Sequence, residues 1–214
     1  MRSNEDVLRK NAEYSNRFIQ PIGESEISVE IRDILVNRKI KSVIDLGCGD
    51  GIFVYPLKKK FPKVDIVGVD ISPRRIAGLK ERFPNSRFYI RDVCDTKLKE
   101  EFDLVYSSQV IEHVSSDKEM VEEMSRLLKS KGVLFCSSVI KKKFAVYKYK
   151  CNGKFALDPT HVREYKNQKE FLDLFRKDFK LLKSWKVPVT RGLLGIQVRI
   201  PGYSLVYGIW EKRK

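Results

Sequence analysis

Three glycines separated by single residues stand out in the stretch VIDLGCGDG, which covers residues 43–51. They are Gly47, Gly49 and Gly51, and Asp45 lies two residues before the first of them. Glycine loses the most conformational freedom on folding, so this density indicates a turn in which a ligand approaches the main chain. A carboxylate at Asp45 would repel a pyrophosphate but would suit a ligand that carries an ammonium group.

The same spacing argues against two common nucleotide sites. A dinucleotide fingerprint, Gly-x-Gly-x-x-Gly, would place its third glycine at position 52, where the sequence has Ile52. A triphosphate-binding loop would end in Gly-Lys-Ser or Gly-Lys-Thr, and this turn contains neither. The turn therefore favours a different class of ligand.

Two further carboxylates follow at the ends of apolar stretches. Asp70 ends the stretch VGVD about 20 residues after Gly51, which is the spacing of a ribose-binding acid. A carboxylate there can accept hydrogen bonds from both ribose hydroxyls. Asp92 ends the next stretch, SRFYIRD, where it could accept a hydrogen bond from an adenine amino group. Three acids at three successive strand ends around one glycine turn are therefore interpreted as one ligand site.

The chain has only two histidines, so candidates for a general base are few. His113 follows Glu112 in the stretch QVIEHV, and His161 lies in the stretch DPTHVREY. Imidazole titrates near neutral pH and can take a proton from a reacting group. Both histidines could instead be structural, with the Glu112–His113 pair anchoring a loop and His161 capping the next helix.

Alternating strands and helices would bring these residues to one edge of a sheet. Apolar stretches bounded by turn residues predict strands at 41–47, 63–70, 86–92, 102–108 and 132–139. Helical periodicity and capping residues predict helices at 5–18, 24–38, 51–61, 72–83 and 118–130. Because these strands are almost continuously apolar, we expect a parallel sheet that is covered on both faces.

The sequence changes character after Val139. A helix is expected at 167–179 and two strands at 179–187 and 203–212, with a loop rich in glycine and apolar residues at 188–202 between them. Together with the first five strands they predict an α/β fold. The expected architecture is a doubly wound, Rossmann-like, seven-stranded sheet, mostly parallel, with the last strand antiparallel.

Residues 41 to about 139 resemble the class I methyltransferases that use S-adenosylmethionine, in particular the small-molecule branch of methyltransferase types 11 and 23. VIDLGCGDG is similar to the first motif of that family, VGVDIS to the second and RDVCD to the third. FDLVYSSQVIEHV resembles the fourth motif, and LLKSKGVLF resembles the segment that enters the fifth strand. The order and spacing of the motifs match over about 100 residues.

The resemblance implies that S-adenosylmethionine is the cofactor and that residues at four strand ends bind it. These are Asp45, Gly47, Cys48 and Gly49 at the loop and methionine moiety, Asp70 and Ile71 at the ribose and adenine, Asp92 and Val93 at the adenine ring, and Ser107 and Ser108 beside the sulfonium. It also implies one domain over 1–214, with N-terminal helices (1–40), a cofactor-binding core (41–139), a basic substrate-side insert (140–165), and a closing helix and strands (166–214).

Methyl transfer is an in-line displacement at a carbon that is already activated by the sulfonium, so the protein mainly orients the reactants. A base is needed only where the acceptor must lose a proton. His113 and His161 are the expected catalytic residues. DPTHVREY resembles a His-x-Arg-x-Tyr/Phe segment of the family, and we expect substrate contacts from Arg163, Tyr165 and Tyr147. No metal site is predicted, because the four cysteines are scattered and no His spacing suggests zinc.

The N-terminal residues Tyr14, Arg17 and Phe18 could fold over the cofactor, as the first helices do in this family. The alternative is that they belong to a helix face that packs on the sheet.

The charge of the chain is uneven. The net charge is +15, and residues 139–214 hold 19 basic and 6 acidic residues. A basic segment suits an acidic small molecule, but lysines with Phe144, Tyr147 and Tyr149 could also bind RNA, and the apolar loop could face anionic lipid. A solvated basic hairpin is the simplest alternative.

We expect a small acceptor, which could be anionic, because no Asn/Asp-Pro-Pro-Tyr type of motif is present. The alternatives are an RNA or protein methyltransferase, and a non-catalytic protein that binds the cofactor or a partner. The sequence indicates no oligomeric state.

The composition predicts a soluble protein. No apolar run reaches the roughly 18 residues of a transmembrane helix, and the polar N-terminus lacks the features of a signal peptide. Four scattered cysteines are typical of free thiols in a reducing compartment. We therefore expect a cytoplasmic protein.

Overall fold

The computed structural model describes residues 4–17, 26–142, 149–151, 154–156, 158, 160–193 and 196–213. Its strands are β1 (Ser42–Leu46), β2 (Asp65–Asp70), β3 (Arg87–Ile90), β4 (Phe102–Ser108), β5 (Leu128–Lys141), β6 (Tyr149–Cys151), β7 (Lys154–Ala156), β8 (Phe179–Leu193) and β9 (Ile196–Lys212). Its helices are α1 (Asn4–Arg17), α2 (Val29–Asn37), α3 (Val54–Lys60), α4 (Pro73–Arg82), α5 (Asp117–Arg126) and α6 (Gln168–Asp173).

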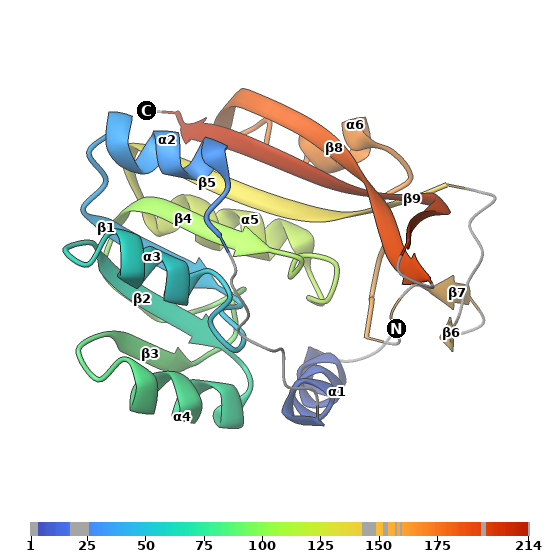
Figure 1. Cartoon of the computed structure of the whole chain (residues 1–214), viewed down its shortest axis with the longest axis horizontal. Helices are drawn as coiled ribbons and strands as arrows, with labels where there is room; N and C mark the ends of the chain where they lie inside the picture. Colours follow the sequence, from blue (N-terminus) through green and yellow to red (C-terminus); the bar gives the residue numbers. More distant parts are fainter. Residues whose placement is uncertain are drawn as a thin grey trace.

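Seven strands form one sheet in the order β3-β2-β1-β4-β5-β9-β8 (Figure 1). The first five strands along the chain pair in parallel, and β9 pairs antiparallel with both β5 and β8. This arrangement confirms the expected seven-stranded, mostly parallel α/β sheet with an antiparallel last strand. The strands β6 and β7 form a separate two-stranded hairpin in the segment 140–165.

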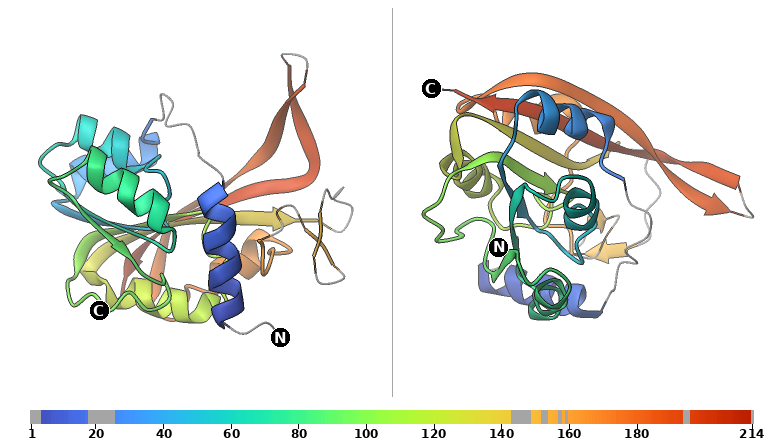
Figure 2. Two further views of the ribbon diagram at one scale, coloured as in Figure 1. Left: turned by 90° about the horizontal axis from the view of Figure 1, so that it is seen from below. Right: turned by 60° about the vertical axis from the view of Figure 1, so that its left-hand side comes forward.

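Helices cover both faces of the sheet, as Figure 2 shows. One hydrophobic core lies beneath α2, α3 and α4, and a second packs against α5 and α6. Neighbouring residues of β1 serve different cores, since Val43 belongs to the first and Ile44 to the second. Both faces are therefore apolar, which explains why the strands are almost continuously hydrophobic in sequence.

Local sequence explains where two of the covering helices begin. Ser72 caps α4 by accepting a hydrogen bond from the main-chain N–H of Arg75, and Pro73 occupies the first position. Pro56 lies in the first turn of α3, where its missing N–H has no intrahelical partner to lose.

The structure corrects one predicted loop. Residues 188–202 are largely strand, because β8 continues to Leu193 and β9 begins at Ile196. The two strands stay paired beyond a register shift between Pro188 and Thr190. Antiparallel pairing satisfies the main chain in this segment, so Gly192 and Gly202 lie within strands. The helix expected at 167–179 is also shorter, since α6 ends at Asp173.

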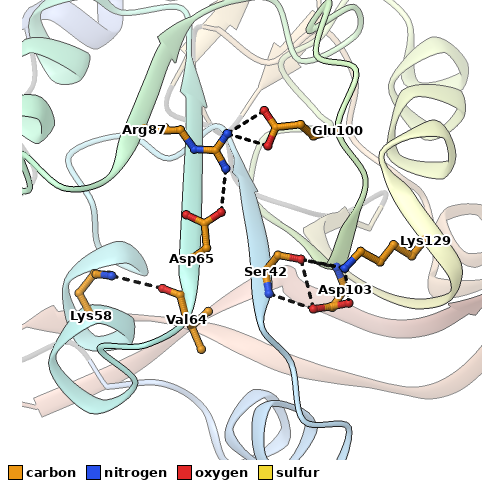
Figure 3. Close-up of polar contacts among 8 residues, drawn as sticks. All are labelled: Ser42, Lys58, Val64, Asp65, Arg87, Glu100, Asp103 and Lys129. Atoms are coloured by element: carbon orange, nitrogen blue, oxygen red, sulfur yellow. Dashed lines mark hydrogen bonds and ion pairs between the residues drawn. The ribbon is translucent and has the colours of Figure 1, made fainter.

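Charged residues join the amino ends of the parallel strands (Figure 3). Arg87 at the start of β3 donates to Glu100 at 2.6 and 2.7 Å and to Asp65 at 2.7 Å. Asp103 in β4 accepts hydrogen bonds of 2.9 Å from the main-chain N–H groups of Lys41 and Ser42. These contacts tie together strands that are distant in sequence.

Within the described ranges, the structure has no helix that is both long enough and apolar enough to cross a membrane.

Candidate active site

The glycine turn lies at the carboxyl end of β1. Gly47, Gly49 and Gly51 have φ angles of +79°, +53° and +93°, which L-residues adopt at a cost. The N–H groups of Gly47 and Cys48 donate to the carbonyl oxygen of Val69 at 2.8 and 3.0 Å. A Cβ atom on Gly47 would lie 2.2 Å from a methyl carbon of Val110. Bare main chain is therefore required here by conformation and by space.

Asp70 holds the turn from the end of β2. One carboxylate oxygen accepts from the N–H of Gly49 at 2.9 Å, and the other accepts from the N–H of Ser72 at 2.8 Å. Burial raises the pKa of Asp70, although these two hydrogen bonds oppose the shift. Asp70 thus links the glycine turn to the beginning of α4, and its side chain still faces the cavity described next.

A cavity of about 510 Å³ lies at the carboxyl ends of β1, β2 and β4. Its volume is in the range of small-molecule sites. Nine of the ten residues expected to bind the cofactor line it: Asp45, Gly47, Cys48, Gly49, Asp70, Ile71, Asp92, Val93 and Ser108. The four strand ends thus meet as the sequence predicted.

Asp45 is a buried carboxyl in the wall of this cavity, with 2% of its surface exposed. Burial and the nearby charge of Asp70 raise its pKa well above the usual range. A cationic group in the cavity would favour the ionised form of Asp45. The carboxyl is therefore suited to a ligand that carries an ammonium group.

Ser107 is the exception among the ten expected residues. It is fully buried, and its hydroxyl donates to the carbonyl oxygen of Leu46 at 2.9 Å. Side chains alternate between the faces of a strand, so Ser107 joins β4 to β1 while Ser108 reaches the cavity. The expected contact of Ser107 with the sulfonium does not fit this position.

The helix α1 lies beyond the carboxyl ends of the parallel strands (Figures 1 and 2). It contributes Leu8, Asn11, Tyr14 and Ser15 to the wall of the cavity. Asn11 donates to the carbonyl oxygen of His113 at 2.8 Å, and Asn16 accepts from the hydroxyl of Ser72 at 2.6 Å. Tyr14 lines the cavity, whereas Arg17 is exposed and is absent from its wall. Phe18 lies outside the described residues.

At the other end of the cavity, His113 and His161 pack edge to face with ring centroids 4.7 Å apart. Thr160 Oγ1 donates to Asp158 at 2.5 Å and lies 2.9 Å from His113 Nδ1. Because the single proton of Thr160 points to Asp158, its oxygen accepts from His113 Nδ1–H. His161 Nδ1 lies 2.8 Å from a carboxylate oxygen of Glu164, which only accepts when ionised. In the neutral form of each ring, Nε2 is therefore the nitrogen that carries the lone pair.

Glu112 lies beside the two imidazoles and is fully buried. One of its carboxylate oxygens accepts from the hydroxyl of Ser138 at 2.9 Å. Burial raises the pKa of Glu112 to about 7, the nearby charge of His161 opposing the shift. Burial, followed by the neighbouring His161, lowers the pKa of His113 to about 4, so this imidazole is neutral at pH 7.

These three residues could also hold a metal ion. One ligand atom from each of Glu112, His113 and His161 lies within 4.8 Å of the others. The sequence predicts no metal site, since it has neither a cysteine pair nor a His spacing that suggests zinc. A ligand set assembled from two distant segments gives no such local pattern.

The cavity wall also contains Glu112, Asp158 and Thr160, which the sequence does not predict as site residues. Glu112 was expected only as a possible loop anchor beside His113. The only local signal was the acidic residue next to His113. Glu112 is held by a hydrogen bond from Ser138 and by main-chain hydrogen bonds from the segment that carries His161. Neither contact is visible in the sequence.

Two expected substrate residues have structural positions instead. Arg163 donates to the carbonyl oxygens of Ile111, Val114 and Ser115 at 2.7–3.0 Å and therefore holds the loop that carries His113. Tyr165 is buried against Phe171, and neither it nor Arg163 is among the described residues of the cavity wall.

The basic segment is only partly described. Tyr147, the third expected substrate residue, and Phe144 lie outside the described residues. Tyr149 lies in β6.

The sequence profile of a family described as "Methyltransferase domain" matches residues 37–185. The chain is 24% identical over 151 residues to malonyl-[acyl-carrier protein] O-methyltransferase 1 of Ilyobacter polytropus, and this match covers 68% of the chain and 55% of that protein. It is 31% identical over 93 residues to trans-aconitate 2-methyltransferase of Variovorax paradoxus, covering 43% of the chain and 36% of that protein. The chain thus spans about half or less of the length of these relatives.

Solved structures share the fold. Coclaurine N-methyltransferase bound to N-methylheliamine and SAH has a TM-score of 0.66 at 13% identity, and the match covers 99% of this chain and 88% of that one. The MccD protein has a TM-score of 0.66 at 15% identity, covering 86% of this chain and 97% of that one. The profile match over most of the chain, together with this shared fold, establishes that the chain belongs to the class I methyltransferases that use S-adenosylmethionine.

Proposed function

We propose that the chain transfers the methyl group of S-adenosylmethionine to a small acidic molecule bound at the His113–His161 end of the cavity. The observation that carries the proposal is the cavity itself. A single cavity joins the four motif-bearing strand ends to the cluster of Glu112, His113 and His161. A methyl donor at one end and an acceptor at the other would meet in line, which is the geometry that displacement requires.

For the cofactor, the proposed contacts follow the chemistry of each cavity residue. Asp45 would pair with the ammonium group, since a positive charge offsets the burial of its carboxyl. Asp70 would accept from the ribose hydroxyls, with Ile71 packing on the adenine. Asp92 and Val93 would contact the adenine ring, and Ser108 would lie beside the sulfonium.

An acidic acceptor is supported by two independent observations. The similar proteins are named for malonyl and trans-aconitate substrates, which are carboxylic acids. The segment 139–214 also has 19 basic and 6 acidic residues, which favours the approach of an anion.

We assign the acceptor chemistry to His113 and His161, assisted by Glu112. A neutral imidazole with a free Nε2 can accept a hydrogen bond or a proton from the acceptor. A carboxyl with a pKa of about 7 is also close to the range in which general bases work best at neutral pH.

The first test is methyl transfer from S-adenosylmethionine labelled in its methyl group. The acceptors would be small di- and tricarboxylic acids, amines, total RNA and protein extract. We expect label in a carboxylic acid, and a loss of about 100-fold or more in kcat/KM for His161→Ala with cofactor affinity unchanged. Glu211→Gln, on the outer surface, is the matched control and should be active.

Asp70→Ala separates the two halves of the proposal. It removes the acceptor of two main-chain hydrogen bonds, so we expect cofactor affinity to fall by about 100-fold or more in a calorimetric titration. Label in RNA with a steep salt dependence would instead support the RNA alternative, which the basic segment also favours. Cofactor binding without labelling of any acceptor class would support the non-catalytic alternative.

We also propose that a single domain serves both ligands. Its parts are the N-terminal helices (1–40), the cofactor-binding core (41–139), the substrate-side insert (140–165), and the closing helix and strands (166–214). Cytoplasmic location stays a prediction of the sequence.

A further inference from the structure

Two imidazoles and one carboxylate converge at the acceptor end of the cavity. The ligand atoms of Glu112, His113 and His161 lie within 4.8 Å of one another. Each residue also lines the cavity, so a small ligand could reach the group from the solvent side. Two histidines and one carboxylate form a common ligand set for divalent transition metals.

The outer hydrogen bonds engage Nδ1 of both imidazoles and leave Nε2 as the ligand atom that each ring can offer. Each Nδ1 is occupied, His113 by Thr160 and His161 by Glu164, so each ring has only Nε2 left as a ligand. Metal-binding histidines are usually held in this way, with the other ring nitrogen donating to a carboxylate or another oxygen. Ser138 in turn holds one oxygen of Glu112. The neighbours of the cluster therefore orient it for a ligand.

The charge balance points to a cation at the same position. Glu112, Asp158 and Glu164 lie around the two imidazoles. Among the described residues of the cavity wall the only Lys or Arg is Arg75, whose Nε is 3.4 Å from Asp50 near the glycine turn. Arg163 directs its guanidinium to main-chain carbonyl groups, and Lys141 is 3.7 Å from Glu164. Among the described residues of the cavity wall, an acidic acceptor at this end would therefore meet carboxylates and no Lys or Arg.

We propose that Glu112, His113 and His161 bind one divalent transition-metal ion, and that an oxygen of the acidic acceptor occupies its open coordination position. Nitrogen-rich sets of this type favour zinc, iron, cobalt or nickel over magnesium and calcium. Three protein ligands leave a position free, as in catalytic zinc sites. The metal site stands on the cluster alone, whereas the role of its open position rests on the proposed function.

The ion would act as a Lewis acid and would hold the acceptor against the methyl donor. In the transfer step a bond forms between an acceptor oxygen and the methyl carbon while the carbon–sulfur bond breaks. The electron pair of that bond stays on sulfur, and the sulfonium becomes a neutral thioether. The ion is neither oxidised nor reduced, so no further reactant is needed.

The test uses cobalt(II), whose visible absorption reports binding without any enzymatic assay. Chelator-treated full-length protein is titrated with cobalt(II), and zinc(II) is then added as a competitor. We expect one ion per chain and displacement by zinc. His161→Ala and Glu112→Gln should each weaken binding by about 100-fold or more, with circular dichroism showing that the variants are folded. Glu164→Gln should weaken binding by about 10–100-fold through the orientation of His161.

Asp70→Ala is the matched control, since it should lose the cofactor and still bind cobalt(II). Folded wild-type protein that binds no cobalt(II), or binds it equally well after His161→Ala and Glu112→Gln, overturns the metal site. Methyl transfer that is undiminished after chelator treatment overturns the role of the ion and leaves the proposed function standing. Cobalt(II) binding in a protein that methylates no acid would support the metal site and contradict the proposed function.

Discussion

The two ends of the parallel strands use charged residues in opposite ways. At the amino ends, Arg87, Asp65 and Glu100 are partly exposed and pair with one another (Figure 3). At the carboxyl ends, Asp45 and Asp70 are buried, and burial raises the pKa of both. The amino-end charges are satisfied within the protein and by water, whereas Asp45 is satisfied best when a cation enters the cavity.

This contrast separates the charged residues that join neighbouring strands from those that we propose bind ligands. Asp103 and Lys129 could be exchanged for other polar pairs with a modest loss of stability, because solvent screens them. A buried carboxyl has no such freedom, since the cost of its burial is recovered only through specific partners. Substitutions at four positions test the contrast, from the largest expected effect to the smallest.

Gly47→Ala should be the most damaging change at the carboxyl ends. The new Cβ would meet Val110 at 2.2 Å, and the φ angle of +79° strains any L-residue. We expect a loss of about 2–4 kcal/mol in the free energy of unfolding, measured by urea denaturation. Gly47→Ala combined with Val110→Ala should recover the part of the lost free energy that comes from the clash. The part that comes from the positive φ angle should remain. Equal losses in the single and double variants would contradict the clash.

Asp45 should make cofactor binding depend on pH. Its pKa in the free protein is raised, and a bound ammonium group would favour the charged form, so binding should release a proton. Cofactor affinity should then rise with pH, by at most about tenfold per unit, until Asp45 is ionised in the free protein. Calorimetry in two buffers of different ionisation enthalpy measures the released proton. If the affinity of Asp45→Asn for the cofactor depended on pH in the same way, another group would be responsible.

Asp103 should contribute stability that is lost in acid. Burial alone would raise its pKa, but Lys129 and two main-chain N–H groups lower it below the usual value. The contribution is therefore complete above the unfolded-state pKa of about 4 and disappears as pH falls through the folded-state value. Asp103→Asn should lose about 1 kcal/mol at pH 7 and less at pH 3, measured by thermal unfolding at both pH values. An equal loss at both would show that the charge is irrelevant.

Arg87→Ala should have the smallest effect. Arg87 pairs with two carboxylates, but its side chain is 39% exposed. We expect a loss below about 1 kcal/mol that shrinks further in 0.5 M salt. Urea denaturation at low and high salt would measure it. A large loss of unfolding free energy that does not depend on salt would contradict the contrast, since it would show that the charges at the amino ends are not screened by solvent.

The residues proposed to bind the cofactor could be predicted as one group because their signals are local. The stretch VIDLGCGDG combines strand, turn and ligand contacts within nine residues, and Asp70 and Asp92 each end an apolar strand. The structure brings these residues into one cavity. Ser107 alone among the ten expected residues is absent from the cavity wall, because side chains alternate between the two faces of β4.

The acceptor half was harder to predict, because contacts between distant segments create it. Thr160 and Asp158 orient His113 from 47 and 45 residues further along the chain, in a segment without periodicity. The segment 188–202 contains glycines and apolar residues that suggest a loop, yet the pairing of β8 with β9 keeps it extended. In this segment, tertiary pairing overrides local propensity.

The position of β9 in the sheet has a consequence for the order in which the molecule assembles. β9 follows β5 and β8 in the chain but lies between them. The ribosome adds about 5–20 residues per second, so β1 to β5 and the glycine turn can form while β9 is still being synthesised. Val139, which lines the acceptor end of the cavity, pairs with Leu205 of β9. A nascent chain could therefore form the cofactor half first, and its acceptor half would be completed only when β9 joins β5.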